Sequence, residues 1–329
     1  MTSAPGSLKL FGEHAVIYNR LALSAAFNRR AFCKLNRAKS GIAIELKDFG
    51  SRKSFSFNDI LRSYTELKRL VGNEDMEGLV KARKDVFSPY KIILGEFLSE
   101  FGFTPLKISI CSDVPRNSGL GSSAAAFCSL ASALNDFAHA GLGRKQLAEL
   151  ANLGDKVVHG NPSGLDANTC AFGGYISFRR SEGVKPLKIS MEVPILVVNT
   201  GSQKDTGEMI SRVAERYRKE RSCTDKIFDR MEETAVNGIQ ALKASNLSEL
   251  GENMSIAQQC FTELGLSTRQ LDVIIDTAME EGALGAKITG AGGGGCIIVL
   301  TRDPRGLIPV YRKMGYDSFE TKLGVVGAD

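Results

Sequence analysis

The fold of this chain depends on the stretch Pro115–Ala126, which reads PRNSGLGSSAAA. Gly119 and Gly121 can take left-handed backbone conformations and let the main chain come close to a ligand. Ser122 and Ser123 stand where a helix of small residues begins, and the free N–H groups and dipole of a helix start favour an anion. The stretch therefore predicts a phosphate cradle, although neither the Walker nor the Rossmann spacing is met. A glycine turn with a serine N-cap on a core helix is the alternative.

The composition is that of an ordinary globular protein and limits the classes of partner. With 329 residues the chain is long for one core, so two domains are expected. A net charge of +5 suits a small anionic ligand and is too mild for nucleic acid. Seven scattered cysteines without a C-x-x-C pair favour reduced thiols in the cytoplasm over disulfides or zinc. The sequence shows no signal peptide and no apolar run that could span a bilayer, so no membrane association is expected.

Apolar spacing predicts strands and helices without regular alternation, which is typical of α+β layers. Strand character is expected over 7–11, 16–27, 30–35, 42–46, 106–111, 168–178, 195–199, 286–289, 296–300 and a last segment near the end. Helices are expected over 66–84, 89–101, 121–139, 144–158, 205–221, 224–244, 247–263, 268–281 and 305–313. The polar connector 182–186 is the best candidate for a boundary between two domains, 1–185 and 186–329.

Two more glycine-rich stretches lie far from the first in the sequence. Residues 4–14 begin with Ala-Pro-Gly and end with Gly-Glu-His, and residues 289–295 read TGAGGGG. A run of glycine and alanine leaves few side chains to pack, so it is either a flexible linker or a place where backbone approaches a ligand. The apolar, β-prone segments on both sides of 289–295 favour close approach.

Four motifs, in order along the chain, resemble those of the GHMP kinases, the family of galactokinase, homoserine kinase, mevalonate kinase and phosphomevalonate kinase. They are SAPGSLKLFGEHAV at 3–16, PRNSGLGSSAAA at 115–126, HGNPSGLD at 159–166 and KITGAGGGGC at 287–296. GEHAV together with HGNPSGLD is most similar to the mevalonate kinase branch. The resemblance implies an α+β fold of two domains. These would be a nucleotide-binding N-terminal domain like ribosomal protein S5 domain 2 and a ferredoxin-like C-terminal domain, with the active site in the cleft between them.

The resemblance also implies that backbone N–H groups of the central loop bind the phosphates of ATP. The residues carried over to this role are Pro115, Asn117, Ser118, Gly119, Leu120, Gly121, Ser122 and Ser123. Ser123 would ligate Mg²⁺ together with Asp155, where mevalonate kinases usually have glutamate. Because Mg²⁺ keeps several waters and aspartate is one methylene shorter than glutamate, a water is expected between Asp155 and the ion. A solvated charge on a helix is the alternative for Asp155.

Asp166 is implied to be the catalytic aspartate, lying beside the accepting hydroxyl as a general base or as an orienting group. An Asx turn is the alternative for this residue. The chain departs from the family at Ser7, where mevalonate kinases have a lysine that pairs with the aspartate. Lys9 lies two residues on, which on a strand is the same face, so we expect it to supply part of the missing positive charge. A solvent-facing strand lysine is the alternative.

Glu13 and His14 resemble the family's substrate pair, and a histidine beside a bound carboxylate is favourable. Thr206 and Ala291 are carried over as acceptor contacts, although a helix N-cap explains Thr206 better. The implied reaction is transfer of the γ-phosphoryl group of ATP to the 5-hydroxyl of mevalonate. Three readings stay open: a sugar kinase of the family, a phosphomevalonate kinase, and a non-catalytic nucleotide-binding relative. The oligomeric state, a homodimer included, also stays open.

Overall fold

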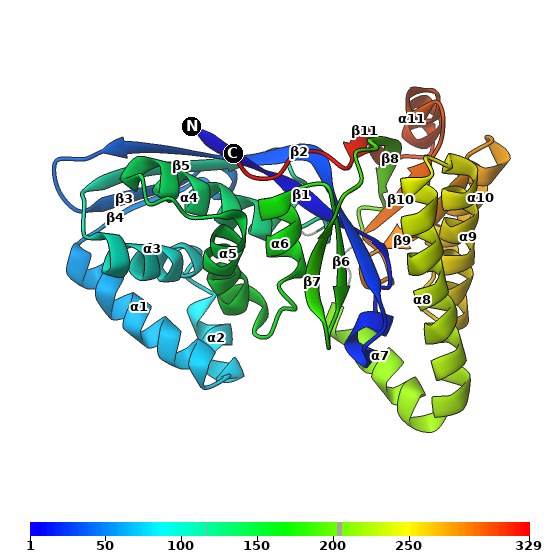
Figure 1. Ribbon diagram of the computed structural model, residues 1–329, viewed down its shortest axis with the longest axis horizontal. Coiled ribbons are helices and arrows are strands. Elements are labelled where there is room, and N and C mark those ends of the chain that lie inside the picture. The colour runs from blue at the N-terminus through cyan, green and yellow to red at the C-terminus, as the bar shows by residue number, and fades with distance from the viewer. Residues whose placement is uncertain (117, 203–205) are drawn as a thin grey trace.

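The computed structural model describes residues 1–116, 118–202 and 206–329, in two lobes side by side (Figure 1). Asn117, expected in the phosphate loop, lies outside the described residues. The strands of the N-terminal lobe are β1 (Thr2–Phe11), β2 (Ala22–Arg37), β3 (Ile42–Leu46), β4 (Ser51–Phe55), β5 (Leu106–Ser112), β6 (Tyr175–Arg179) and β7 (Gly183–Leu187). Its helices are α1 (Phe57–Gly72), α2 (Met76–Ala82), α3 (Ser88–Phe101), α4 (Ser122–Ala138), α5 (Arg144–His159) and α6 (Leu165–Phe172).

The C-terminal lobe has the topology expected of a ferredoxin-like domain. Its strands are β8 (Val193–Asn199), β9 (Gly285–Thr289), β10 (Cys296–Leu300) and β11 (Asp317–Leu323). Its helices are α7 (Thr206–Lys219), α8 (Arg221–Lys243), α9 (Leu247–Glu263), α10 (Arg269–Glu280) and α11 (Pro304–Lys313). The strands pair in the antiparallel order β11-β8-β10-β9, which is the split arrangement of a ferredoxin-like unit. The expected α+β fold is confirmed.

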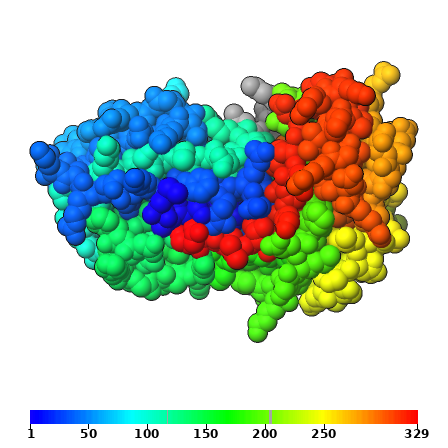
Figure 2. All heavy atoms as spheres, turned by 90° about the horizontal axis from the view of Figure 1, so that it is seen from above, coloured from blue at the N-terminus to red at the C-terminus, as the bar shows by residue number. Residues whose placement is uncertain are grey.

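The long strand β2 joins the two lobes into one sheet. It pairs with β1 along most of β1, and also with β5, β6 and, at Phe27, with Leu323 of β11. The C-terminal residues return to the N-terminal lobe, where the N–H of Asp329 donates to the carbonyl of Ser3 at 3.0 Å. In Figure 2 this red segment lies against the dark-blue first strand. The strand β1 is thus held by its pairing with β2 and, at Ser3, by the C-terminal residues.

The helix α4 holds the end of the central loop firmly against the sheet. Every residue from Ala124 to Leu134 is buried, because small side chains let the helix pack closely on β1 and β2. The short helix α6 packs beside α4 and on β1. Residues on β1, at the start of α4 and at the start of α6 are therefore neighbours on one rigid support.

Several expectations about local structure are wrong. The strand expected over 16–27 begins only at Ala22, because Ala15–Tyr18 form a 3-10 helix. The helix expected over 66–84 begins earlier, at a capping box between Ser56 and Asp59, and is interrupted after Gly72, where Glu74 takes a left-handed φ of 51°. Residues 168–172 are helical, in α6, because their small side chains pack on α4, and only 175–179 form a strand. The connector expected at 182–186 is strand β7, paired with β6.

The boundary between 185 and 186 would fall inside β7, so the division of the chain at that point stays a prediction. Among the described helices, not one combines the length and the apolar character that crossing a membrane requires.

Candidate active site

A charged centre forms where β1 meets α6. Asp166 lies in the first turn of α6, and the Nζ of Lys9 lies 2.5 Å from each of its carboxylate oxygens. The hydroxyl of Ser7 also donates to Oδ1 of Asp166. Ser7 and Lys9 are two residues apart on β1, so the alternation of the strand points both side chains to α6. The expected pairing of Lys9 with Asp166 is present.

The environment of Asp166 favours its ionised form. Burial by itself would raise the pKa of this carboxyl, but the charge of Lys9 and the hydrogen bonds from Lys9 and Ser7 lower the pKa below its ordinary value. The side chain is still 32% exposed, so it is accessible to a ligand. Asp166 is therefore a negatively charged hydrogen-bond acceptor at neutral pH.

The central loop packs directly against β1 at Ser7. The N–H of Ser7 donates to the carbonyl of Leu120 at 3.1 Å, and Leu120 is buried in the core. The hydroxyl of Ser118 donates to the carbonyl of Pro115 at 2.7 Å, and that of Ser122 donates to the carbonyl of Val114 at 3.3 Å. Both hydroxyls thus hold the loop in shape, and the backbone N–H groups in the described part of the loop are donors that it can offer to an anion.

Among the described residues, no side chain caps the start of α4. The residue at the N-cap is Gly121, in the left-handed region with φ 67°. The expected alternative, a serine N-cap, is therefore wrong: Ser122 and Ser123 are the first two residues of the helix. Uncapped N–H groups and the positive end of the dipole give this point the character of a phosphate site.

Gly121→Ala is expected to lower kcat/KM for ATP about tenfold or more, because the loop would have to move away from Ser7. A Cβ at Gly121 would lie 2.3 Å from the Oγ of Ser7 and 2.9 Å from its N. The control is Gly141→Ala, which has a similar φ of 70° but open space around the added Cβ. Steady-state kinetics with varied ATP check the prediction, and equal effects of the two substitutions would contradict it.

Asp155, on α5, is suited to a cation. The side chain is 4% exposed, and its burial together with the negative charge of Asp166 raises its pKa to about 8. A divalent ion near the two carboxylates would relieve this repulsion. No cluster of three His, Cys, Asp or Glu side chains able to hold a metal occurs within the described ranges. A site of few protein ligands fits Mg²⁺, which keeps waters and takes phosphate oxygens.

Glu13 forms a buried ion pair with Lys287 of the other lobe. The Nζ of Lys287 lies 2.6 Å from Oε1 of Glu13 and also donates to the carbonyl of Ile288 at 2.5 Å. Lys287 is 0% exposed and lies inside β9. The other oxygen of Glu13, Oε2, is buried and has no hydrogen-bond partner in the part of the chain that the structure describes. Lys287 was not expected as a site residue, although it opens the motif KITGAGGGGC.

His14 connects the same turn to the third glycine-rich stretch. Its Nε2 lies 2.8 Å from the carbonyl oxygen of Ala291, and since a carbonyl only accepts, this nitrogen carries the proton. At the beginning of this stretch, the hydroxyl of Thr289 donates to the carbonyl of Lys9 at 3.0 Å. The structure thus brings Glu13, His14 and Ala291 together beside β1.

Thr206 is the expected residue that stands apart. It begins α7 and is exposed, and within the ranges the structure describes it makes no hydrogen bond to Glu13, His14 or Asp166. Its contact with the acceptor stays a prediction.

Lys287→Met is expected to lower the free energy of unfolding by about 3 kcal/mol, because it leaves the Glu13 carboxylate buried without a counter-charge. Adding Glu13→Gln should recover much of this loss, since the uncompensated charge is then removed. The control is Lys322→Met, whose partner Glu192 is half-exposed and whose loss should cost less than about 1 kcal/mol. Urea unfolding at neutral pH measures all three, and a Lys287→Met protein as stable as the control would contradict the prediction.

Two family models match the chain, one in each lobe. Residues 89–174 match the family model "GHMP kinases N terminal domain" and residues 239–319 match "GHMP kinases C terminal". The mevalonate kinase of Thermococcus sibiricus is 32% identical over 309 residues, 91% of this chain and 88% of that protein. The mevalonate kinase of Aeropyrum pernix is 28% identical over 331 residues, 99% of this chain and 96% of that protein. The crystal structure of Methanococcus jannaschii mevalonate kinase is 25% identical and superposes with a TM-score of 0.83 over 98% of both chains.

Proposed function

The chain belongs to the GHMP kinase family and, within it, to the mevalonate kinases, and on this premise we propose that it transfers the γ-phosphoryl group of ATP to the 5-hydroxyl of mevalonate. The observation that carries the proposal is the contact of Asp166 with both Lys9 and Ser7. At this point an ionised carboxylate is held by β1, which contacts the phosphate loop at Ser7 and leads into the turn that carries Glu13 and His14.

The central loop and the start of α4 hold the triphosphate. Backbone N–H groups around Gly121 and the positive end of the α4 dipole bind the phosphate oxygens without reorganising during the reaction. Ser123 and Asp155 are the residues that would hold Mg²⁺, which supplies neutralisation of the negative charge on the phosphates when bound. Positioning and charge neutralisation supply most of the rate in phosphoryl transfer.

Asp166 orients the alcohol that accepts the phosphoryl group. Its Oδ1 accepts from Ser7 and Lys9, whereas Oδ2 accepts only from Lys9 among the described residues and keeps a lone pair for the hydroxyl. Because Lys9 lowers the pKa of Asp166, the carboxylate is a weak base. Orientation of the hydroxyl therefore fits this group better than full proton removal beforehand: the new O–P bond forms, the bond from the γ-phosphorus to the oxygen of ADP breaks, and the hydroxyl proton passes to the transferred phosphoryl group.

Glu13 and His14 line the acceptor end of the site. The buried Oε2 of Glu13 suits a substrate hydroxyl and repels a carboxylate, so we place the carboxylate of mevalonate away from it. Lys287 neutralises Glu13 and keeps that side chain in place. The absence of the family lysine at Ser7 is a feature that favours a non-catalytic relative, but Lys9 brings a positive charge to the same aspartate.

ADP release tests the proposal. The protein is assayed with ATP and Mg²⁺ in the presence of mevalonate, phosphomevalonate, galactose or homoserine, against a blank without acceptor. We expect release that depends on mevalonate and on Mg²⁺. The proposed function would be contradicted if the chain binds ATP but none of the four acceptors leads to ADP release. It would also be contradicted if another acceptor of the panel is preferred over mevalonate.

A further inference from the structure

The turn that follows His14 has a backbone that needs support from outside. It connects β1 to β2 through the short 3-10 helix Ala15–Tyr18. His14 and Asn19, at its two ends, have left-handed φ values of 60° and 62°. Residues other than glycine rarely take this backbone conformation, and it persists where contacts with the surrounding structure stabilise it. What holds this turn therefore also holds Glu13 and His14 at its beginning.

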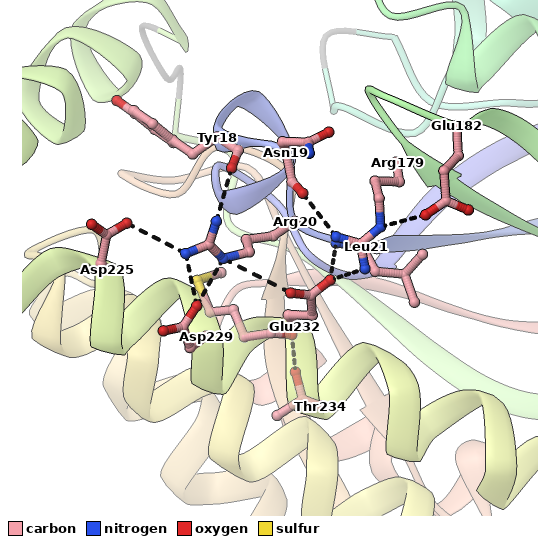
Figure 3. Close-up of polar contacts among 11 residues, drawn as sticks. Tyr18, Asn19, Arg20, Leu21, Arg179, Glu182, Asp225, Asp229, Glu232 and Thr234 are labelled. Carbon is pink, nitrogen blue, oxygen red and sulfur yellow. Dashed lines mark hydrogen bonds and ion pairs between the residues drawn. The ribbon is translucent and has the colours of Figure 1, made fainter.

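Arg20 attaches the turn to α8 (Figure 3). Its Nε lies 2.8 Å and its Nη2 lies 2.7 Å from Oδ1 of Asp229, and Nη2 lies 3.4 Å from Asp225. Its Nη1 donates to the carbonyl of Tyr18 at 3.2 Å, so the same guanidinium also closes the turn on itself. The side chain of Arg20 is 24% exposed, so these pairs are only partly screened by water.

Glu232 is the point where the turn, α8 and the β6–β7 hairpin meet (Figure 3). Its Oε1 accepts from the backbone N–H of Leu21 at 3.0 Å and from the guanidinium of Arg179 on β6. Its Oε2 lies 3.8 Å from Arg20. Arg179 in turn donates to the carbonyl of Asn19 at 3.0 Å. The Glu232 carboxylate thus holds the backbone of the turn directly at Leu21. It also holds the turn indirectly at Asn19, through Arg179.

The contacts of α8 with the turn come from one face of the helix. Asp225, Asp229 and Glu232 are spaced by four and three residues, which places them in a row. Phe228 lies in the same row, and its ring stacks on Tyr18 with centroids 4.6 Å apart. About two turns of helix α8 therefore hold a single connection between two strands.

We propose that Glu232 is a positioning residue for the acceptor end of the active site. It holds the backbone after His14, so it sets where Glu13 and His14 stand, and this inference rests on the proposed function. The nucleotide loop, Asp166 and Lys9 belong to other elements and make no contact with Glu232 among the residues described. Loss of Glu232 should therefore weaken the binding of the acceptor and leave the binding of ATP unchanged.

Glu232→Gln tests the proposal with little change of shape. The amide keeps an oxygen that can accept from Leu21 but loses the charge that pairs with Arg179 and Arg20. We expect KM for mevalonate to rise about tenfold, equivalent to about 1.4 kcal/mol, with KM for ATP and the midpoint of thermal unfolding close to wild type. Arg179→Gln should give the same split, and the double variant should fall short of the product of the two single effects, because the residues act as one unit.

The control is Glu233→Gln, the same change at the next, exposed position of α8. Equal changes in both KM values, no change beyond the control, or a loss of activity that follows a fall in the unfolding midpoint would each overturn the positioning role. Wild-type protein is assayed alongside. If wild type itself shows no mevalonate-dependent ADP release, the proposed function fails, whereas an active wild type with no KM split in the variants refutes the inference alone.

Discussion

Asp166→Asn is expected to lower kcat with mevalonate by about a thousandfold while ATP still binds, because loss of an aligned acid–base or orienting group costs about this much. Asparagine has nearly the same size but carries no negative charge. Its amide also presents N–H groups to Ser7 and Lys9, which now donate to the carboxylate. Steady-state ADP release measures kcat, and calorimetry measures the binding of ATP.

The matched control for Asp166→Asn is Asp136→Asn, the same change at an exposed position near the end of α4. The control should keep wild-type kinetics. A variant at Asp166 with kcat within about tenfold of wild type would remove this residue from the chemistry, since even the weaker general-base effects exceed that factor.

Lys9→Met should lower kcat by at least about tenfold, the smallest loss expected when a preorganised positive charge near the transferring phosphoryl group is removed. It should also change the pH dependence. Lys9 lowers the pKa of Asp166, so without it the pKa rises, and the acid limb of the pH–rate profile should move to higher pH. Rates measured from acid to neutral pH check both effects.

Lys34→Met serves as the control for Lys9→Met, since Lys34 is an exposed lysine on the neighbouring strand β2. Lys9→Arg should keep more activity than Lys9→Met because it retains the charge. If Lys9→Met has the kcat and the acid limb of wild type, then Lys9 pairs with Asp166 in the structure without taking part in the reaction.

Local rules were enough to place Lys9. Alternation along a strand put it on the face of Ser7, and the structure shows both side chains on Asp166. The ferredoxin-like order of the second lobe, in contrast, was expected only from the resemblance of four motifs to the GHMP kinases, and the strand order β11-β8-β10-β9 confirms it. Local rules failed at 168–172, where small residues are compatible with strand or helix, and packing on α4 decided for helix. They failed at 182–186, where a polar Gly/Pro stretch forms a hairpin strand and not a linker.

Lys287 and Glu232 could not be found from the sequence because nothing near them in the chain marks their roles. Lys287 pairs with a residue 274 positions away, and a single lysine within a short strand is typical of a solvent-facing position. Glu232 lies on a helix rich in charge, where its partners Leu21 and Arg179 come from separate elements. The roles of such residues depend on tertiary contacts and can be identified only in the folded structure. Glycine-rich loops, in contrast, can be identified from the sequence alone.

The most direct test of the whole account is the identity of the product. The protein is incubated with ATP, Mg²⁺ and mevalonate, and phosphorus and carbon NMR locate the new phosphate ester. We predict one phosphate on the primary 5-hydroxyl for each ADP released. An ester on the tertiary hydroxyl, or ADP released without any phosphorylated mevalonate, would contradict the account.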